Sequence, residues 1–549
     1  MICRTALESQ DMTAVPEAAG AHPVHDRDLA LGTFSDDAPW QIDPDQLAWL
    51  TGLDSTRAEL RSQLPALTRP RRLPGFRVVR VVWVLGTAVA MWYLLERRKA
   101  GPESRAGISR RLRRAAERLG PAYIKLAQII SSGEGLFPAE LVNECKRCRD
   151  QVPAESFRDV IDVVEQELGV AMIDVFATFD SEPLAAASIA QVHRATLRAT
   201  GQEVVVKVQR PSVARSVRQD LKVMAWLAPF LIGRIPVAAL ANPPALVELF
   251  AETIVEELDF RLEAQSMLDV ARSLRELGQD HFVVPRPHPE LVTRRMLVME
   301  RLDGFAFDDV AGMRAAGVDT EAIVRTGMIA FLEGCMLHGI FHGDLHGGNL
   351  FVQPDGRTAL LDFGITARMS GKERHAFLRL LVTATMNNVM GQLEALRDLG
   401  ALPADTDLQA VIDDLDLEGA VVDPTQLSPE ELIGELQAII KQLLAYGARL
   451  PKSLMLFVKN LVFLDGAIAT LAPDLDLFEV VTKVSVHFAT NHGRRIAEEV
   501  GMNPDDYELD LTGMKASFGV DPAATDSLTY RELVERRDII RSRLRDARA

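Results

Sequence analysis

Cysteine is scarce in this sequence, and its scarcity excludes a fold held together by disulfides. The 549-residue chain has four cysteines, of which Cys145 and Cys148 form one CxxC. So few thiols in so long a chain favour a reducing compartment. A structural zinc site needs four ligands, and this CxxC has neither a second pair nor a histidine set nearby. We therefore interpret it as two thiols on a helix.

Long apolar runs are also missing. A helix that spans a bilayer needs roughly 20 apolar residues, whereas VVWVLGTAVAMWYLL, residues 81–95, supplies 15. Basic residues flank this stretch, and Trp83, Trp92 and Tyr93 lie near its ends, where amphipathic rings favour a membrane interface. We predict a helix that lies on or dips into a membrane, with a helix buried against the protein itself as the alternative. The stretch begins 80 residues into the chain, so we expect no secretory signal.

A net positive charge is confined to one segment of the chain. Residues 57–119 contain 16 Lys or Arg and 4 Asp or Glu, a net charge of +12, whereas the remaining residues contain 45 and 73, a net charge of −28. This asymmetry indicates an anionic surface as the partner of one end of the chain. We expect an anionic membrane lipid surface and no nucleic acid. The protein would be cytoplasmic and peripherally membrane-associated, or anchored through residues 81–95.

The rest of the composition, 48% hydrophobic and 25% charged, is that of a globular α+β protein. Helical patterns flank a central region of short β-branched runs, and residues 246–274 predict one long helix. The patterns divide the chain into a disordered segment 1–55, a basic segment 56–104, a helical extension 105–172, a small β-rich lobe 173–302, a helical lobe 303–495 and a charged tail 496–549. This order is typical of kinases.

The stretch FHGDLHGGNLF, residues 341–351, gathers polar residues and glycines between two apolar ends. Asn349 precedes the strand-like LFVQ, and Asp362 ends the strand-like TALLDF. A tight hairpin between these strands would bring both side chains to one Mg²⁺, which prefers hard oxygen ligands. Asp344, five residues before Asn349, would then orient an acceptor. The pattern predicts a phosphoryl-transfer site.

Lys207 lies in the middle of the short strand VVVKVQ, where a buried ammonium group needs an anion. Nucleotide phosphates would serve, with a glutamate from a helix as the protein partner. His342 and His346 raise zinc as an alternative, but the glycines around them argue against the helix that an HxxxH metal site uses. We predict that these histidines fix the loop or bond its backbone.

Together these motifs resemble the ABC1/UbiB (AarF/ADCK-type) atypical kinase family, over about residues 105–490. HGDLHGGN with LLDFG resembles the family's catalytic and metal loops, and VVVKVQRP resembles its nucleotide-lysine strand. AAASIAQVHRA resembles the alanine-rich loop that the family carries where protein kinases have a glycine-rich loop. KLAQ, followed by LFP, resembles the KxGQ signature of the family's helical extension.

The resemblance implies a bilobal protein-kinase-like fold with a KxGQ-like helical extension, and ATP or ADP with Mg²⁺ as cofactors. In this scheme Glu263 pairs with Lys207, while Glu257 and Asp259 hold Lys125 over the active site. The implied site residues are Asp344 and Lys207 for catalysis; Ala185, Ala186, Ala187, Ser188, Lys207, Glu263, Met299, Glu300 and Leu302 for the nucleotide; Asn349 and Asp362 for the metal; and Lys125, Gln128, Glu257 and Asp259 for the regulatory extension.

The sequence departs from the family pattern at Ala127, where the signature has glycine, and in SSGEGLFP, which replaces a basic–acidic continuation. Both departures bear on regulation by the extension rather than on nucleotide binding. The implied function is that of a kinase or ATPase in lipid or isoprenoid-quinone metabolism at a membrane surface, with a lipid or small-molecule acceptor. Two alternatives stay open: a soluble phosphotransferase of the aminoglycoside or choline kinase type, which shares HGDxHxxN, and a nucleotide-binding scaffold without turnover.

Overall fold

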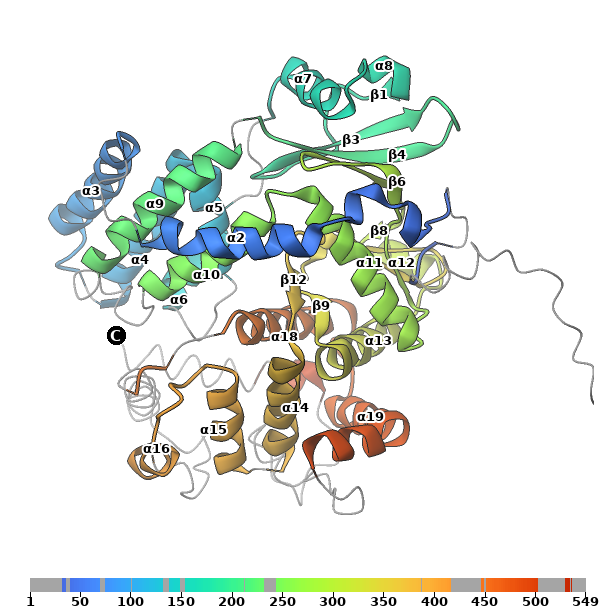
Figure 1. Cartoon of the computed structure of the whole chain (residues 1–549). Helices are drawn as coiled ribbons and strands as arrows, with labels where there is room; N and C mark the ends of the chain where they lie inside the picture. Colours follow the sequence, from blue (N-terminus) through green and yellow to red (C-terminus); the bar gives the residue numbers. More distant parts are fainter. Residues whose placement is uncertain are drawn as a thin grey trace, which may run out of the picture.

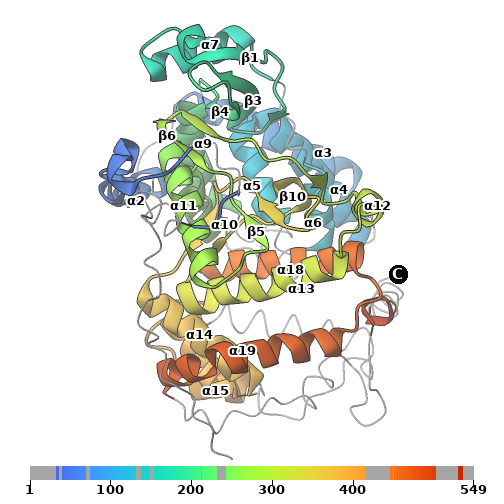
Figure 2. The same ribbon diagram turned by 90° about the vertical axis from the view of Figure 1, so that its right-hand side faces the viewer.

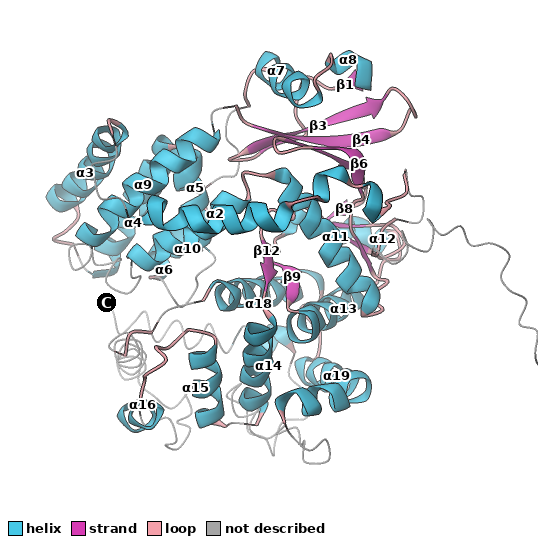
Figure 3. Cartoon of the chain, viewed as in Figure 1, coloured by secondary structure: helices cyan, strands magenta, loops and turns pink. Residues whose placement is uncertain are grey.

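The computed structural model describes residues 32–35, 40–69, 75–99, 101–131, 138–148, 154–211, 213–231, 243–386, 388–415, 446–448, 451–501, 529–533 and 535. These residues form a small lobe built on a β-sheet and a larger helical lobe, with a further group of helices beside the small lobe (Figure 1). Figure 3 shows the strands concentrated in the small lobe and at the junction between the lobes. The predicted α+β, bilobal kinase-like fold is confirmed.

A six-stranded antiparallel sheet forms the small lobe, in the order β1–β3–β4–β7–β6 with β2 paired to β3. Its strands are β1 (Phe176–Phe179), β2 (Ala185–Ala186), β3 (Ala190–Leu197), β4 (Glu203–Gln209), β6 (Pro287–Val292) and β7 (Met296–Glu300). Helices α7 (Phe157–Leu168) and α8 (Met172–Val175) lie over one face, where the valines of α7 pack on those of β4. Because side chains alternate along a strand, Lys207 lies on the opposite face of β4 from Val206 and Val208.

Helix α11 (Phe260–Glu276) packs against β6 and β7 and carries Glu263. We predicted one long helix over residues 246–274, and this prediction was wrong. The chain breaks at residues 257–259 into α10 (Pro243–Glu256) and α11, because the Asp259 side chain accepts a hydrogen bond from the backbone N–H of Arg261 and so starts a new helix.

The helices beside the small lobe come from two stretches of sequence, one before the sheet and one between β4 and α11. They are α2 (Leu53–Thr68), α3 (Arg77–Leu95), α4 (Gly101–Leu119), α5 (Pro121–Ser131), α6 (Ala139–Cys145), α9 (Val213–Leu231) and α10. Helix α5 packs against α4, α6, α9 and α10, which place it next to the junction between the lobes.

The large lobe is mainly helical, and Figure 2 shows α13 and α18 side by side with α14, α15 and α19 beyond them. Its helices are α12 (Val310–Ala315), α13 (Thr320–Glu333), the π-helix η4 (Gly334–His338), α14 (Gly371–Thr385), α15 (Val389–Asp398), α16 (Leu408–Leu415), α18 (Lys452–Leu471) and α19 (Leu477–Val500). Its strands are β8 (Phe305–Ala306), β9 (Ile340–His342), β10 (Leu350–Val352), β11 (Thr358–Leu360) and β12 (Thr366–Arg368), and β5 (Phe282–Val283) pairs with β11.

The first 55 residues were expected to be disordered, and for part of them this expectation was wrong. The 3₁₀ turns η1 (Pro44–Gln46) and η2 (Ala48–Leu50) lie against the small lobe, where the indole N–H of Trp49 donates to the carbonyl of Pro289. The backbone N–H of Thr33 donates to Ala271 of α11. Residues 1–31, 36–39 and most of the predicted tail 496–549 lie outside the described residues, although α19 extends to residue 500.

Candidate nucleotide and phosphoryl-transfer site

The predicted hairpin between the two metal-binding motifs is present. Strands β10 and β11 pair antiparallel with Leu350 opposite Leu360, and the backbone N–H of Leu361 donates to the carbonyl of Asn349 at 2.9 Å. Asn349 and Asp362 therefore lie at the same end of the hairpin. Asp362 has φ = 54°, which is uncommon for a residue other than glycine and, as often at functional sites, marks a strained backbone.

His342 fixes the loop that carries Asp344. Its Nε2 lies 2.9 Å from the carbonyl of Leu361, and its Nδ1 accepts the backbone N–H of Asp344 at 3.1 Å. Burial lowers the pKa of His342, so the ring is neutral and donates through Nε2. His346 in turn accepts the backbone N–H of Gly348 at 3.1 Å. Both contacts confirm the prediction of loop-fixing histidines.

The amide of Asn349 completes this loop. Its Nδ2 donates to the carbonyl of Asp344 at 3.0 Å, which leaves the amide oxygen as the atom available to a cation. An amide oxygen and the Asp362 carboxylate at one end of a hairpin form the kind of donor set that binds Mg²⁺ together with phosphates. The residues present thus fit Mg²⁺.

Lys207 joins the small lobe to this hairpin. Its Nζ lies 2.6 Å from Glu263 Oε1 on α11 and 3.0 Å from Asp362 Oδ1. Burial alone would lower the pKa of Lys207, but the fields of Asp362 and Glu263 outweigh burial and hold the pKa above its usual value. Burial raises the pKa of Glu263 to about 7, with Lys207 opposing the rise. The pairing of Lys207 with Glu263 is as predicted.

Lys125, from the KxGQ-like motif on α5, also lies in this site. Its Nζ is 3.2 Å from Glu257 Oε2, and the fields of Glu257, Asp344 and Asp362 overcome burial and raise the pKa of Lys125. The other carboxylate oxygen of Glu257, Oε1, is buried without a hydrogen-bond partner. Gln128 is half-buried one turn further along α5.

Asp259 was expected to hold Lys125 together with Glu257, and the structure corrects this. Besides capping α11, the Asp259 carboxylate accepts two hydrogen bonds from the guanidinium of Arg261, at 2.9 and 2.7 Å. Glu257 directly follows the end of α10, whereas Asp259 caps the start of α11. This difference explains why two acids so close in sequence have different partners. Ala127, at the signature's glycine position, is buried among Leu141 and the two CxxC thiols.

Two residues of α18 reach the site, and no sequence motif predicted either of them. Lys459 forms an ion pair with Asp344 Oδ1. Asn460, fully buried, donates to the carbonyl of His342, and its Oδ1 accepts the backbone N–H of Leu345 at 3.2 Å. Burial would raise the pKa of Asp344, but the fields of Lys459 and Lys125 lower it to about 2. No motif connects FVKNLVF to a loop that lies more than a hundred residues earlier.

The alanine-rich loop lies at the edge of the small-lobe sheet. Ala185 and Ala186 form β2, Ala187 bonds Ala190 through its backbone N–H at 2.9 Å, and Ser188 is buried in the turn between them. The Nε of Arg210 donates to the carbonyl of Ala187 at 3.0 Å and so supports the turn from β4.

The predicted hinge begins with the last two residues of β7 and continues into the junction between the lobes. Met299 pairs with β4, and the backbone of Glu300 bonds Arg286 at 2.9 Å, while the Glu300 carboxylate accepts from Ser35. Leu302 packs with Val283, at the start of the large lobe's sheet.

The charges of the site are nearly balanced. Lys125, Lys207 and Lys459 bring three ammonium groups, and Asp344, Asp362, Glu257 and Glu263 bring four carboxylates. The set therefore has one net negative charge, which a divalent cation would reverse, and the ammonium groups could then bind phosphates.

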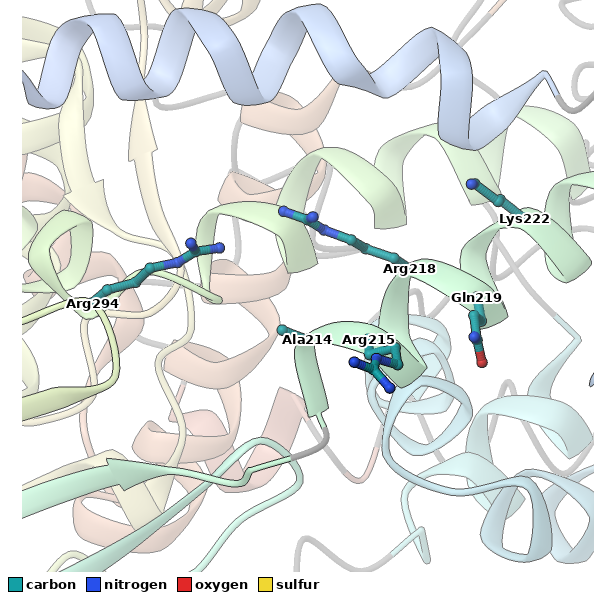
Figure 4. A pocket seen from close by; sticks show the side chains of 6 residues that line it. All are labelled: Ala214, Arg215, Arg218, Gln219, Lys222 and Arg294. Carbon is teal, nitrogen blue, oxygen red and sulfur yellow. The ribbon is translucent and has the colours of Figure 1, made fainter. Parts of the chain in front are cut away.

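A separate cationic recess lies on α9. It encloses about 310 Å³ and is lined by Ala214, Arg215, Arg218, Gln219, Lys222 and Arg294 (Figure 4). Arg294 belongs to the β6–β7 turn, and its guanidinium points toward the α9 side of the recess (Figure 4). None of the predicted nucleotide residues lines it.

The CxxC is buried, as expected of a structural pair. Cys145 ends α6 and Cys148 lies in the turn after it, and both side chains pack with Leu141. Burial raises the pKa of Cys145 to about 12, so the thiol is protonated at neutral pH.

The bilobal fold and this set of lysines, carboxylates and amides define a kinase-like protein. A sequence model of the ABC1 atypical kinase-like domain matches residues 147–395. An uncharacterized protein of Mycobacterium tuberculosis is 36% identical over 362 residues, covering 65% of this chain and 73% of that protein. The probable protein kinase UbiB of Vibrio campbellii is 30% identical, covering 68% and 69%. The Arabidopsis thaliana chloroplastic protein ACTIVITY OF BC1 COMPLEX KINASE 1 is 30% identical, covering 74% and 59%. The chain belongs to the ABC1/UbiB family of atypical kinases.

Proposed function

We propose that this protein is an ATP- and Mg²⁺-dependent atypical kinase or ATPase that acts on a lipid or isoprenoid-quinone substrate at a membrane surface. One observation carries the proposal: three buried or half-buried lysines from three different parts of the chain converge on Asp344 and Asp362. Three ammonium groups at one place suit a triphosphate better than any acceptor of low charge.

Each side chain has a distinct role in this proposal. Lys207, held by Glu263, binds the α- and β-phosphates, while Asn349 and Asp362 supply the oxygen ligands of Mg²⁺, which neutralises phosphate charge when bound. Asp344, whose pKa of about 2 keeps it ionised, orients an acceptor hydroxyl or water rather than removing its proton early. In a phosphoryl transfer with a loose transition state, positioning matters more than base strength.

Helix α5 restricts the acceptor. Lys125 reaches the catalytic carboxylates from α5, so this helix would lie beside a bound acceptor. A folded protein acceptor would have to displace the ion pair of Lys125 with Glu257. Small or flexible acceptors avoid this cost, which favours a lipid or a metabolite.

Helix α3 supports action at a membrane. It spans Arg77–Leu95, 19 residues long, and is one of two described helices long and apolar enough to cross a bilayer. The other, α18, packs in the large lobe and contacts the catalytic loop. On α3, however, Trp83 is 71% and Leu94 75% exposed, and only Val78, Val81 and Trp92 are buried. This exposure favours the membrane-associated alternative over a helix buried against the protein.

Some of the cations beside α3 remain available to an anionic lipid partner, but fewer than the net charge of the segment suggests. Arg97, Arg98 and Lys99 are exposed at its carboxyl end. By contrast, Arg111 pairs with Glu96 at 3.1 Å and Arg113 with Glu144 at 3.0 Å, so part of the segment's net charge of +12 is used within the protein.

Mg²⁺-dependent ATP hydrolysis, measured with and without vesicles of anionic phospholipid, tests the proposal. We expect vesicles to stimulate turnover and to sediment with the protein. The Leu94→Asp variant should lose both effects while keeping its basal turnover. The matched control is Ile173→Asp, because Ile173 is 66% exposed on the small lobe, away from α3.

The other outcomes separate the alternatives. Turnover that depends on a soluble alcohol and ignores vesicles would support a small-molecule phosphotransferase. Tight binding of Mg²⁺–ATP without turnover in any condition would support a scaffold. Equal vesicle stimulation of the Leu94→Asp and Ile173→Asp variants would remove α3 as the membrane contact.

A further inference from the structure

Three metal-ligating side chains meet in the large lobe, away from the nucleotide site. Glu333 ends α13 and its side chain is 1% exposed, while His487 and His492 project from α19. The Nε2 atoms of the two histidines lie 2.6 and 2.7 Å from the same oxygen, Glu333 Oε1. The three ligand atoms all lie within 4.8 Å of one another.

Among the described residues, the two histidines are the only basic side chains paired with Glu333. In the part of the chain that the structure describes, Glu333 forms no ion pair with a lysine or arginine, and its other oxygen accepts from Gln279. With neutral imidazoles the cluster buries one net negative charge. A buried carboxylate without a counter-charge is costly, and a divalent cation would supply that charge.

We propose that Glu333, His487 and His492 form a divalent metal site, and that Zn²⁺ is the ion it fits best. Two imidazoles and one carboxylate form the three-ligand set that binds zinc with a fourth position left open. Around a tetrahedral ion, ligand atoms lie about 3.3 Å apart, so metal binding requires the present contacts of 2.6 and 2.7 Å to lengthen by roughly two thirds of an ångström. Side-chain rotations of α19 residues at the surface accommodate such a change.

Neighbouring side chains already orient the ligands. Asn491 lies 3.1 Å from His487 Nδ1. When His487 Nε2 binds a metal, Nδ1 carries the proton, and a rotated Asn491 amide accepts it through its oxygen. Gln279, in the loop that follows α11, holds the carboxylate of Glu333 in the same way. Metal-ligating groups commonly have such outer partners, because these fix the tautomer and the orientation of the ligand.

The place of the cluster indicates what the metal does. Glu333 is followed directly by the π-helix η4 and then by β9, which leads to His342 and the catalytic loop. Helix α19 also contacts this segment through Arg495, whose guanidinium donates to the carbonyl of Leu337 at 2.9 Å. A metal between α13 and α19 would therefore clamp the segment on which the catalytic loop depends. The site is structural and does not rest on the proposed activity.

Titration of the chelator-treated, full-length protein with Zn²⁺ and Co²⁺ tests this proposal. We expect one equivalent to bind, with a higher thermal midpoint, and Co²⁺ to give the absorption of a tetrahedral nitrogen–oxygen site. The variant with His487→Gln and His492→Gln keeps side-chain amides that can donate to Glu333, but should bind on the order of 100-fold more weakly. His281→Gln changes an exposed histidine outside the cluster and should bind like the wild type.

Further outcomes would overturn the proposal. One is Zn²⁺ binding by the double variant as tight as that of the wild type. Another is a thiolate-to-cobalt charge-transfer band, which would assign the metal to the CxxC thiols. Failure of the wild type to bind either metal would leave only two imidazoles hydrogen-bonded to a carboxylate. If the double variant misfolds, the single variant His492→Gln can be tested in its place. Circular dichroism compared with the wild type checks that the single variant is folded.

Discussion

The ion pair between Lys459 and Asp344 makes a quantitative prediction about stability. Lys459→Met removes the ammonium group next to a carboxylate that is buried in the catalytic loop. In the wild type the pKa of Asp344 is about 2, against an ordinary value of 3.8. This difference corresponds to about 2.5 kcal/mol of stability at neutral pH. Removing one partner of a buried pair costs about 3–5 kcal/mol, because the remaining charge is uncompensated. We therefore expect a loss of about 3 kcal/mol.

The direction in which the pKa of Asp344 shifts determines how that loss of stability depends on pH. In the wild type, the depressed pKa of Asp344 stabilises the fold above pH 3.8, and this contribution disappears only as the pH falls toward 2. In Lys459→Met, the field of Lys125 remains but the larger field that opposes burial is lost, so the pKa of Asp344 should rise from its wild-type value and acid should relieve the buried charge. The difference in stability between variant and wild type should therefore shrink between pH 7 and pH 4.

Urea denaturation at several pH values, followed by circular dichroism, measures both effects. The control is Lys459→Arg, which keeps the positive charge and should stay within about 1 kcal/mol of the wild type at pH 7. A Lys459→Met protein with the wild-type midpoint at pH 7, or with a deficit that stays constant down to pH 4, would refute the reasoning.

Four further predictions concern other parts of the structure. Asp362→Asn should abolish Mg²⁺-dependent binding of ADP in calorimetry, and unchanged binding would contradict the metal assignment. Lys125→Met should lower the free energy of unfolding by about 3–5 kcal/mol by leaving Glu257 unpaired; adding Glu257→Gln should recover most of it, measured in urea. Gly343→Ala should cost about 1–3 kcal/mol, because its Cβ would lie 3.0 Å from the backbone of Ile365, whose carbonyl accepts the N–H of Gly343. Cys145 should resist iodoacetamide at pH 8 until urea unfolds the protein, since burial raises its pKa to about 12.

The nucleotide site was largely predictable because its parts are local. Asp344, Asn349 and Asp362 lie within one loop–hairpin unit, where residue order and turn chemistry fix which side chains meet. The partnership of Lys207 with Glu263 crosses 56 residues, and only the family resemblance suggested it.

Contacts from distant helices could not be predicted. Lys459 lies in a helix whose apolar pattern indicates only a core, and nothing local distinguishes it from a surface lysine. The same holds for the Glu333 cluster, whose ligands come from two helices 154 residues apart. The prediction for Asp259 failed for a different reason: this residue caps α11 and pairs with Arg261, so its carboxylate is not directed at Lys125.

The opening segment has a consequence for how this protein can be divided. Its few described residues bridge α11 and the segment that follows β5, since Thr33 donates to Ala271 on one side and accepts the N–H of Val284 on the other. Phe34 and Ile42 are buried in the main core, and Arg286 stacks on the ring of Phe34. A fragment cut at the start of the matched kinase domain would expose this apolar surface to water. We therefore expect a fragment that begins near residue 32 to be more stable than one that begins at residue 147, where the match to the family starts.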